Sequence, residues 1–217
     1  MTQARKIPRD FYAPGTLSIA RDLIGMHLVH NDAGALRVGR IVETEAYMGP
    51  QDLAAHSAKG RTARTEVMFG PPGHAYVYFI YGFWYCLNIV TAAEGVPHAV
   101  LLRALEPVTG IAQMAANRGL DKDAPERMIA SGPSRLCMAL GLTRPLHNGV
   151  DVTSATSSLQ VRDDGFPEPE VVITPRIGIK HAVDWPLRFA LRGHICVSGP
   201  KWLAGLSTIR IGRSSVE

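Results

Sequence analysis

Residues 41–47, with the sequence IVETEAY, place two glutamates among apolar and aromatic residues. Side chains alternate between the faces of a strand, so Glu43, Glu45 and Tyr47 share one face, with the carboxylates ~6.6 Å apart along the chain. A carboxylate beside aromatic surface can have a raised pKa and act as a general acid or base. The pattern therefore predicts an acid–base site, with a solvated outer strand face as the alternative.

A histidine and a basic loop follow this strand. His56 lies in QDLAAHS, and the loop 59–64 has the sequence KGRTAR. His56 could join Glu43 and Glu45 as a metal ligand, but these residues lack the spacing of a helical HExxH motif. The spacing therefore argues against a metal site.

Aromatic residues are concentrated in one stretch of the chain. Seven of them fall within ten residues: Tyr76, Tyr78, Phe79, Tyr81, Phe83, Trp84 and Tyr85. Core packing explains Phe79 readily, but Tyr76 and Tyr78 share a strand face, and each buried phenol needs a hydrogen-bond partner. Such residues build stacking platforms for bases or sugars, and a Tyr-Gly pair at a hairpin tip can insert between base steps. The stretch therefore indicates a ligand-binding hairpin.

The charge is unevenly distributed. The chain has 23 basic and 19 acidic residues, a net charge of +4. Between residues 176 and 213, Asp184 is the one acidic residue against seven basic ones: Arg176, Lys180, Arg188, Arg192, Lys201, Arg210 and Arg213. Arginine suits bidentate phosphate contacts, so this segment predicts an anion-binding surface, with ordinary solvated charge as the alternative.

The helices and strands expected from the sequence do not follow a regular strand–helix–strand order. We expect strands at 28–30, 36–47, 75–81, 83–90, 98–105, 171–174 and 187–191, and helices at 16–24, 109–118 and 133–140. Thr16 and Ser131 are expected to cap their helices, and residues 143–170 to form turns. Strands that precede helices without a βαβ rhythm predict an α+β fold. We expect one compact domain over residues 1–217, with a curved antiparallel or mixed sheet, a protruding hairpin, and surrounding helices and long loops.

The remaining composition bears on the compartment. Three widely spaced cysteines support neither a disulfide framework nor a CxxC metal site, and no signal peptide or membrane span is evident. These features predict a cytoplasmic protein, associated with the nucleoid in a bacterium, that makes no membrane contact. We also expect a monomer.

Four strings carry a family resemblance over about residues 9–195: GRIVETEAYMGPQDLAAHS, MFGPPGHAYVYFIYGFWYCLNIV, VLLRALEP and SGPSRLC. In this order they resemble the alkyladenine family of 3-methyladenine DNA glycosylases. The resemblance implies a monofunctional base-excision repair hydrolase whose partner is double-stranded DNA with damaged purines. It would flip an alkylated or deaminated purine out of the duplex and hydrolyse the N-glycosidic bond, leaving an abasic site, without a metal or cofactor.

The resemblance also implies residue roles. Glu45 would activate water and Arg103 would help to orient it. The base pocket would contain Tyr47, His56, Tyr78 and Asn88, and Tyr81 would insert into the duplex. Independently of the resemblance, the basic residues Arg61, Arg64, Lys180 and Arg192 are candidate phosphate contacts, which would make binding salt-dependent.

Two other functions stay open from the residues. A sugar glycosidase would use Glu43 and Glu45 as its acid and nucleophile. A non-enzymatic nucleic-acid-binding module would use only the tyrosines and the basic segment 176–213.

Overall fold

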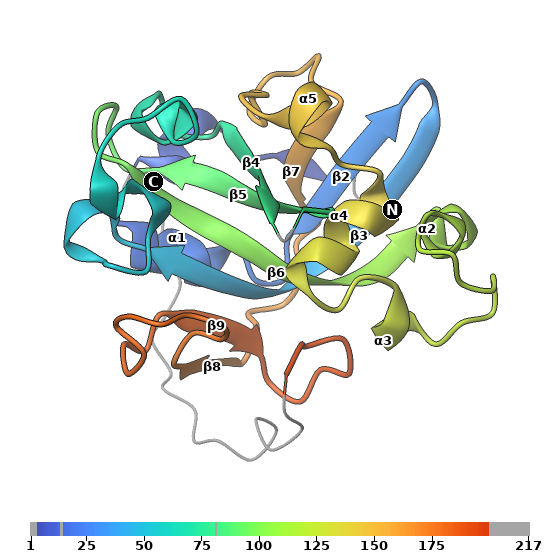
Figure 1. Cartoon of the computed structure of the whole chain (residues 1–217). Helices are drawn as coiled ribbons and strands as arrows, with labels where there is room; N and C mark the ends of the chain where they lie inside the picture. Colours follow the sequence, from blue (N-terminus) through green and yellow to red (C-terminus); the bar gives the residue numbers. More distant parts are fainter. Residues whose placement is uncertain (1–3, 14, 81, 200–217) are drawn as a thin grey trace.

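In the computed structural model, which describes residues 4–13, 15–80 and 82–199, a nine-stranded sheet runs through the molecule (Figure 1). The strands are β1 (Arg5–Lys6), β2 (His27–Asp32), β3 (Ala35–Tyr47), β4 (Ala75–Ile80), β5 (Trp84–Thr91), β6 (His98–Thr109), β7 (Leu159–Asp163), β8 (Val171–Thr174) and β9 (Arg188–Leu191). The main order is β1-β7-β2-β3-β6-β5-β4, with β8 and β9 attached to β3 through β9. Every pair of these strands is antiparallel.

Strand β3 is the centre of this arrangement. Its first half pairs with β2, its other edge pairs with β6 along nearly its whole length, and β9 takes over from β2 at residues 43–45. The register with β6 shifts on both sides of Glu43, which is typical of β-bulges and re-aims side chains. Both glutamates are fully buried, so they do not lie on a solvated face of the sheet.

Strands β4 and β5 form the predicted hairpin. The ends of the two strands that lie away from the turn are buried, whereas aromatic residues near the turn are exposed, with Phe83 79% exposed. Gly82 has a φ of +75°, a backbone conformation that glycine adopts without steric cost. Tyr81, the predicted tip residue, lies outside the described residues.

Short helices cover the sheet. They are α1 (Thr16–Asp22), α2 (Ile111–Asn117), α3 (Glu126–Ile129), α4 (Pro133–Leu140) and α5 (Arg144–His147), with 3-10 turns at Arg9–Tyr12, Gly49–Gln51, His56–Lys59 and Glu66–Phe69. Helix α1 contacts β3, where the Thr44 hydroxyl donates to the Ala20 carbonyl oxygen, so Glu43 and Glu45 point to the opposite face. Helix α4 packs against β5 and β6. Within the described ranges, no helix is long and apolar enough to cross a membrane.

The α+β prediction and the hairpin are confirmed, but two local predictions are wrong. Thr16 does not cap α1, because its hydroxyl bonds to Thr91 and His98 and Gly15 occupies the N-cap. Gly132, not Ser131, is the N-cap of α4. Residues 143–170, expected to be rich in turns, also contain β7, which pairs with β1 and β2, and the short helix α5.

Candidate active site

A cavity of about 400 Å³ opens between the end of β3, the β4–β5 hairpin, the start of α4 and the loop 177–181. Its lining includes six of the predicted residues: Tyr47, His56, Tyr78, Asn88, Arg103 and Lys180. They come from positions up to 133 residues apart (180 − 47). The fold therefore gathers the predicted base-pocket residues around one space.

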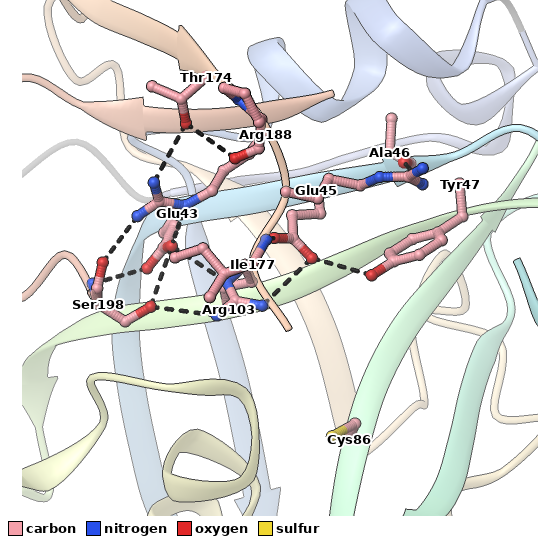
Figure 2. A network of polar contacts seen from close by, with 12 residues as sticks. Glu43, Glu45, Ala46, Tyr47, Cys86, Arg103, Thr174, Ile177, Arg188 and Ser198 are labelled. Atoms are coloured by element: carbon pink, nitrogen blue, oxygen red, sulfur yellow. Dashed lines mark hydrogen bonds and ion pairs between the residues drawn. The ribbon is translucent and has the colours of Figure 1, made fainter. Parts of the chain in front are cut away.

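Glu45 lies directly behind the wall of this cavity and is fully buried. One carboxylate oxygen accepts from the Ile177 N–H at 2.8 Å, and the other accepts from the Tyr47 hydroxyl at 3.0 Å and lies 3.2 Å from Arg103 Nη1 (Figure 2). All three of these partners line the cavity. Burial raises the pKa of Glu45, and the charge of Arg103 with the two hydrogen bonds opposes that rise. A carboxylate with a raised pKa is a stronger proton acceptor.

Glu43 has a different environment, although it is also fully buried. It accepts from Arg103 Nε at 3.1 Å and Arg188 Nε at 2.6 Å. The backbone N–H of Ser198 donates to it at 2.7 Å and the Ser198 hydroxyl at 3.0 Å. Two guanidinium groups and two further donors therefore occupy this carboxylate, which anchors Arg103 beside Glu45 (Figure 2).

His56, Tyr76 and Tyr78 form an aromatic cluster in the cavity wall. The His56 ring lies 4.4 Å from that of Tyr78 in an edge-to-face arrangement, and Tyr76 lies 5.5 Å from Tyr78. Arg64 donates to His56 Nε2 at 3.4 Å, so Nδ1 carries the proton and donates to the Tyr76 hydroxyl at 3.0 Å. Burial, with a smaller effect of Arg64, lowers the pKa of His56 to about 4. His56 is therefore a neutral ring at pH 7.

Arg176 supports Tyr47 from outside the cavity. Its guanidinium stacks 4.6 Å from the centre of the Tyr47 ring and donates to the Ala46 carbonyl oxygen. It also forms two hydrogen bonds with Asp52, at 2.5 and 2.8 Å, with both side chains fully buried. Sequence reasoning missed Asp52, whose one local signal was an acidic residue directly before the apolar residues 53–55.

The predicted phosphate contacts differ in how they are engaged. Lys180 is exposed at the cavity wall, whereas Arg61 pairs with Glu66 at 3.4 Å and Arg192 with Glu170 at 3.3 Å. Arg64 lies at the His56–Tyr78 cluster, 5.5 Å from the centre of the Tyr78 ring. Lys180 and Arg64 are therefore associated with the cavity residues, whereas Arg61 and Arg192 are each paired with a carboxylate.

The interpretation of 176–213 as an anion-binding surface is wrong for two of its basic residues. Arg176 and Arg188 are buried in ion pairs with Asp52 and Glu43. Lys201, Arg210 and Arg213 lie outside the described residues. Among the residues that the structure does describe, no group of three or more His, Cys, Asp or Glu side chains could hold a metal ion.

The family model described as methylpurine-DNA glycosylase matches residues 10–195, which is most of the chain. The chain belongs to the methylpurine-DNA glycosylase family. This membership confirms the resemblance seen in the four strings.

Three relatives illustrate how close the methylpurine-DNA glycosylase match is. Each is named as a 3-methyladenine DNA glycosylase. A protein of Koribacter versatilis is 48% identical over 94% of this chain and 98% of its own length. One from Methanocella arvoryzae is 49% identical over 88% of this chain and 95% of its own, and one from Bacillus cereus is 47% identical over 88% and 98%. The similarity therefore extends over nearly whole chains.

Proposed function

We propose that this protein is a DNA repair glycosylase that removes damaged purines from double-stranded DNA and leaves an abasic site. The observation that carries the proposal is the aromatic-lined cavity, with a buried carboxylate, Glu45, directly behind Tyr47, Arg103 and Ile177. A base inside a duplex conceals its N-glycosidic bond, so the nucleotide must leave the stack before the bond can be attacked. The cavity supplies a place for it, and Asn88 supplies an amide in the wall that can screen purine substituents.

The proposed reaction needs one base. Glu45 accepts a proton from a water molecule at the wall formed by Tyr47, Arg103 and Ile177, and the water oxygen bonds to C1′. The C1′–N bond breaks through an oxocarbenium-like transition state, and its electron pair leaves with the purine. An alkylated purine carries a positive charge and departs as a neutral base, so it leaves far more readily than adenine. Arg103 favours the ionised form of Glu45 and holds the carboxylate in place.

Aromatic stacking on Tyr47 and Tyr78 adds to this selectivity, but the contribution is reduced because an arginine already lies against each ring. A cationic base gains cation–π attraction on Tyr47 and Tyr78. Arg176 already stacks on Tyr47, and Arg64 lies over Tyr78, so each ring carries a neighbouring cation. Leaving-group chemistry is therefore the larger source of discrimination in our account.

The two other functions fit the contacts less well. A two-carboxylate glycosidase needs Glu43 as a second free acid, but Arg103, Arg188 and Ser198 occupy it. A purely binding module gives no reason for a buried carboxylate with a raised pKa behind the cavity wall. We further propose that the enzyme acts as a monomer in the cytoplasm.

Release of free base from methylated duplex DNA tests the proposal. We expect the purified protein to release methylated purines and leave the strand uncut, and Glu45→Gln to bind the same duplex without releasing base. No release from any alkylated duplex, or hydrolysis of sugar glycosides in its place, would contradict the proposed function.

A further inference from the structure

Ser198 contacts the buried carboxylate of Glu43 and lies three positions after the last residue of the family match. Its N–H and its hydroxyl donate to the two oxygens of Glu43, at 2.7 and 3.0 Å. Its carbonyl oxygen accepts from Arg188 Nη2 at 2.7 Å. Ser198 therefore contacts both Glu43 and Arg188, as the dashed lines around Ser198 in Figure 2 show.

We propose that Ser198 is a positioning residue that fixes the orientation of Arg103, and through it that of Glu45, for the reaction proposed above. The Arg103 guanidinium has three anchors. Nε donates to Glu43 Oε1 at 3.1 Å, Nη2 donates to the Ser198 hydroxyl at 3.4 Å, and Nη1 faces Glu45 Oε2 at 3.2 Å. Ser198 supplies the second anchor itself and holds the carboxylate that supplies the first.

The hydrogen bonds at Ser198 are mutually compatible. A hydroxyl has one proton and two acceptor sites, so it can donate to Glu43 while it accepts from Arg103. The backbone groups of Ser198 remain with Glu43 and Arg188 when the hydroxyl is removed. A substitution by alanine therefore removes one specific anchor of Arg103 and leaves the local backbone contacts in place.

The charges around Glu45 determine how loss of the Ser198 hydroxyl would change the pH–rate profile. The groups that face Glu45 are Arg103 from β6, Tyr47 and Glu43 from β3, and the Ile177 N–H, while Arg188 from β9 faces Glu43. Arg103 opposes the rise that burial causes in the pKa of Glu45. A less firmly held Arg103 stabilises the ionised form less, so the acid limb of the pH–rate profile moves to higher pH.

The test compares Ser198→Ala and Ser198→Thr with Ser157→Ala as the matched control. Ser157 is a half-buried serine whose hydroxyl donates to the Leu159 carbonyl oxygen, in the segment before β7. We expect Ser198→Ala to lower the single-turnover rate of base release about tenfold, the effect of losing one hydrogen bond between charged or strongly polar groups. Binding to lesion-containing duplex should change by less than about twofold, because the anchor acts on the reacting state.

The pH profile separates positioning from a structural role. Ser198→Ala should shift the acid limb upward, Ser198→Thr should keep the wild-type rate and limb because it retains the hydroxyl, and Ser157→Ala should match the wild type. An unchanged rate of base release in Ser198→Ala would overturn this proposal. So would a loss of rate that is explained by unfolding while the acid limb stays where it is in the wild type. In either case, base release by the wild-type protein would leave the proposed function standing. An inactive wild-type protein would overturn both.

Discussion

The buried pair of Arg176 and Asp52 joins segments 124 residues apart, and its disruption should destabilise the whole fold. In Arg176→Met, Asp52 keeps hydrogen bonds from the Met48 and Ala54 N–H groups, both at 3.1 Å, but loses its counter-charge. Removing one partner of a buried pair costs about 3 to 5 kcal/mol. For a chain of this length each kcal/mol lowers the melting temperature by about 2 to 4 °C, so a decrease on the order of 10 °C follows.

Thermal unfolding followed by circular dichroism measures this effect. The double variant Arg176→Met with Asp52→Asn should be less destabilised than Arg176→Met, because no uncompensated charge remains buried. Burial raises the pKa of Asp52, but the Arg176 hydrogen bonds and charge outweigh it and hold that pKa below its usual value. The stabilisation is therefore present above the unfolded pKa of about 3.9 and is lost as the pH falls through the lower folded value. A melting temperature within about 2 °C of wild type for Arg176→Met would refute the reasoning.

Three other outcomes are expected. Binding to duplex DNA should weaken steeply with salt, and a slope near zero in a plot of log binding constant against log salt concentration would contradict DNA binding. Lys180→Ala should lower the magnitude of this slope by about one. Arg192→Ala should lower it less, because Arg192 already pairs with Glu170. Tyr81→Ser should weaken base flipping by about 1 to 3 kcal/mol without lowering the melting temperature, and more than Phe83→Ser, as measured with duplex and single-stranded substrates; unchanged release from duplex would remove Tyr81 from the inserting role. The pKa of His56 in the folded protein, about 4, lies below its unfolded value, so the free energy of unfolding should decline as the pH falls from about 6.5 toward 4. His56→Gln should reduce that decline, as measured by urea titrations. An equal decline in both proteins would contradict a neutral His56.

Elements whose signal is local were predictable from the sequence. The helix Pro133–Leu140 and the strand Val171–Thr174 lie where their patterns predicted, because hydrophobic periodicity and Gly141 define them within a few residues. Strand β7 was not predicted, because polar turn residues surround it and only its pairing with β1 and β2 makes it a strand. Thr16 illustrates the same limit, since a tertiary contact with Thr91 and His98 takes the hydroxyl that a cap would use.

The site was predictable in its composition but not in its charge pairing. The family motifs named the residues that line the cavity, and the alternation of residues 43–47 placed the glutamates on one face. A count of charges cannot reveal that Arg188 pairs with a residue 145 positions away. For the same reason Arg176 was assigned to a surface, and Ser198 had no local signal at all.

Base release from methylated duplex DNA by Glu45→Gln and by Glu43→Gln shows whether a single carboxylate acts as the base. Glu45→Gln should abolish release while lesion binding persists, because Glu45 alone is placed as the base behind the cavity wall. Glu43→Gln should retain measurable release, since a glutamine still offers an oxygen to Arg103 and Arg188. Equal loss in both variants would contradict the account and favour a mechanism that uses two carboxylates.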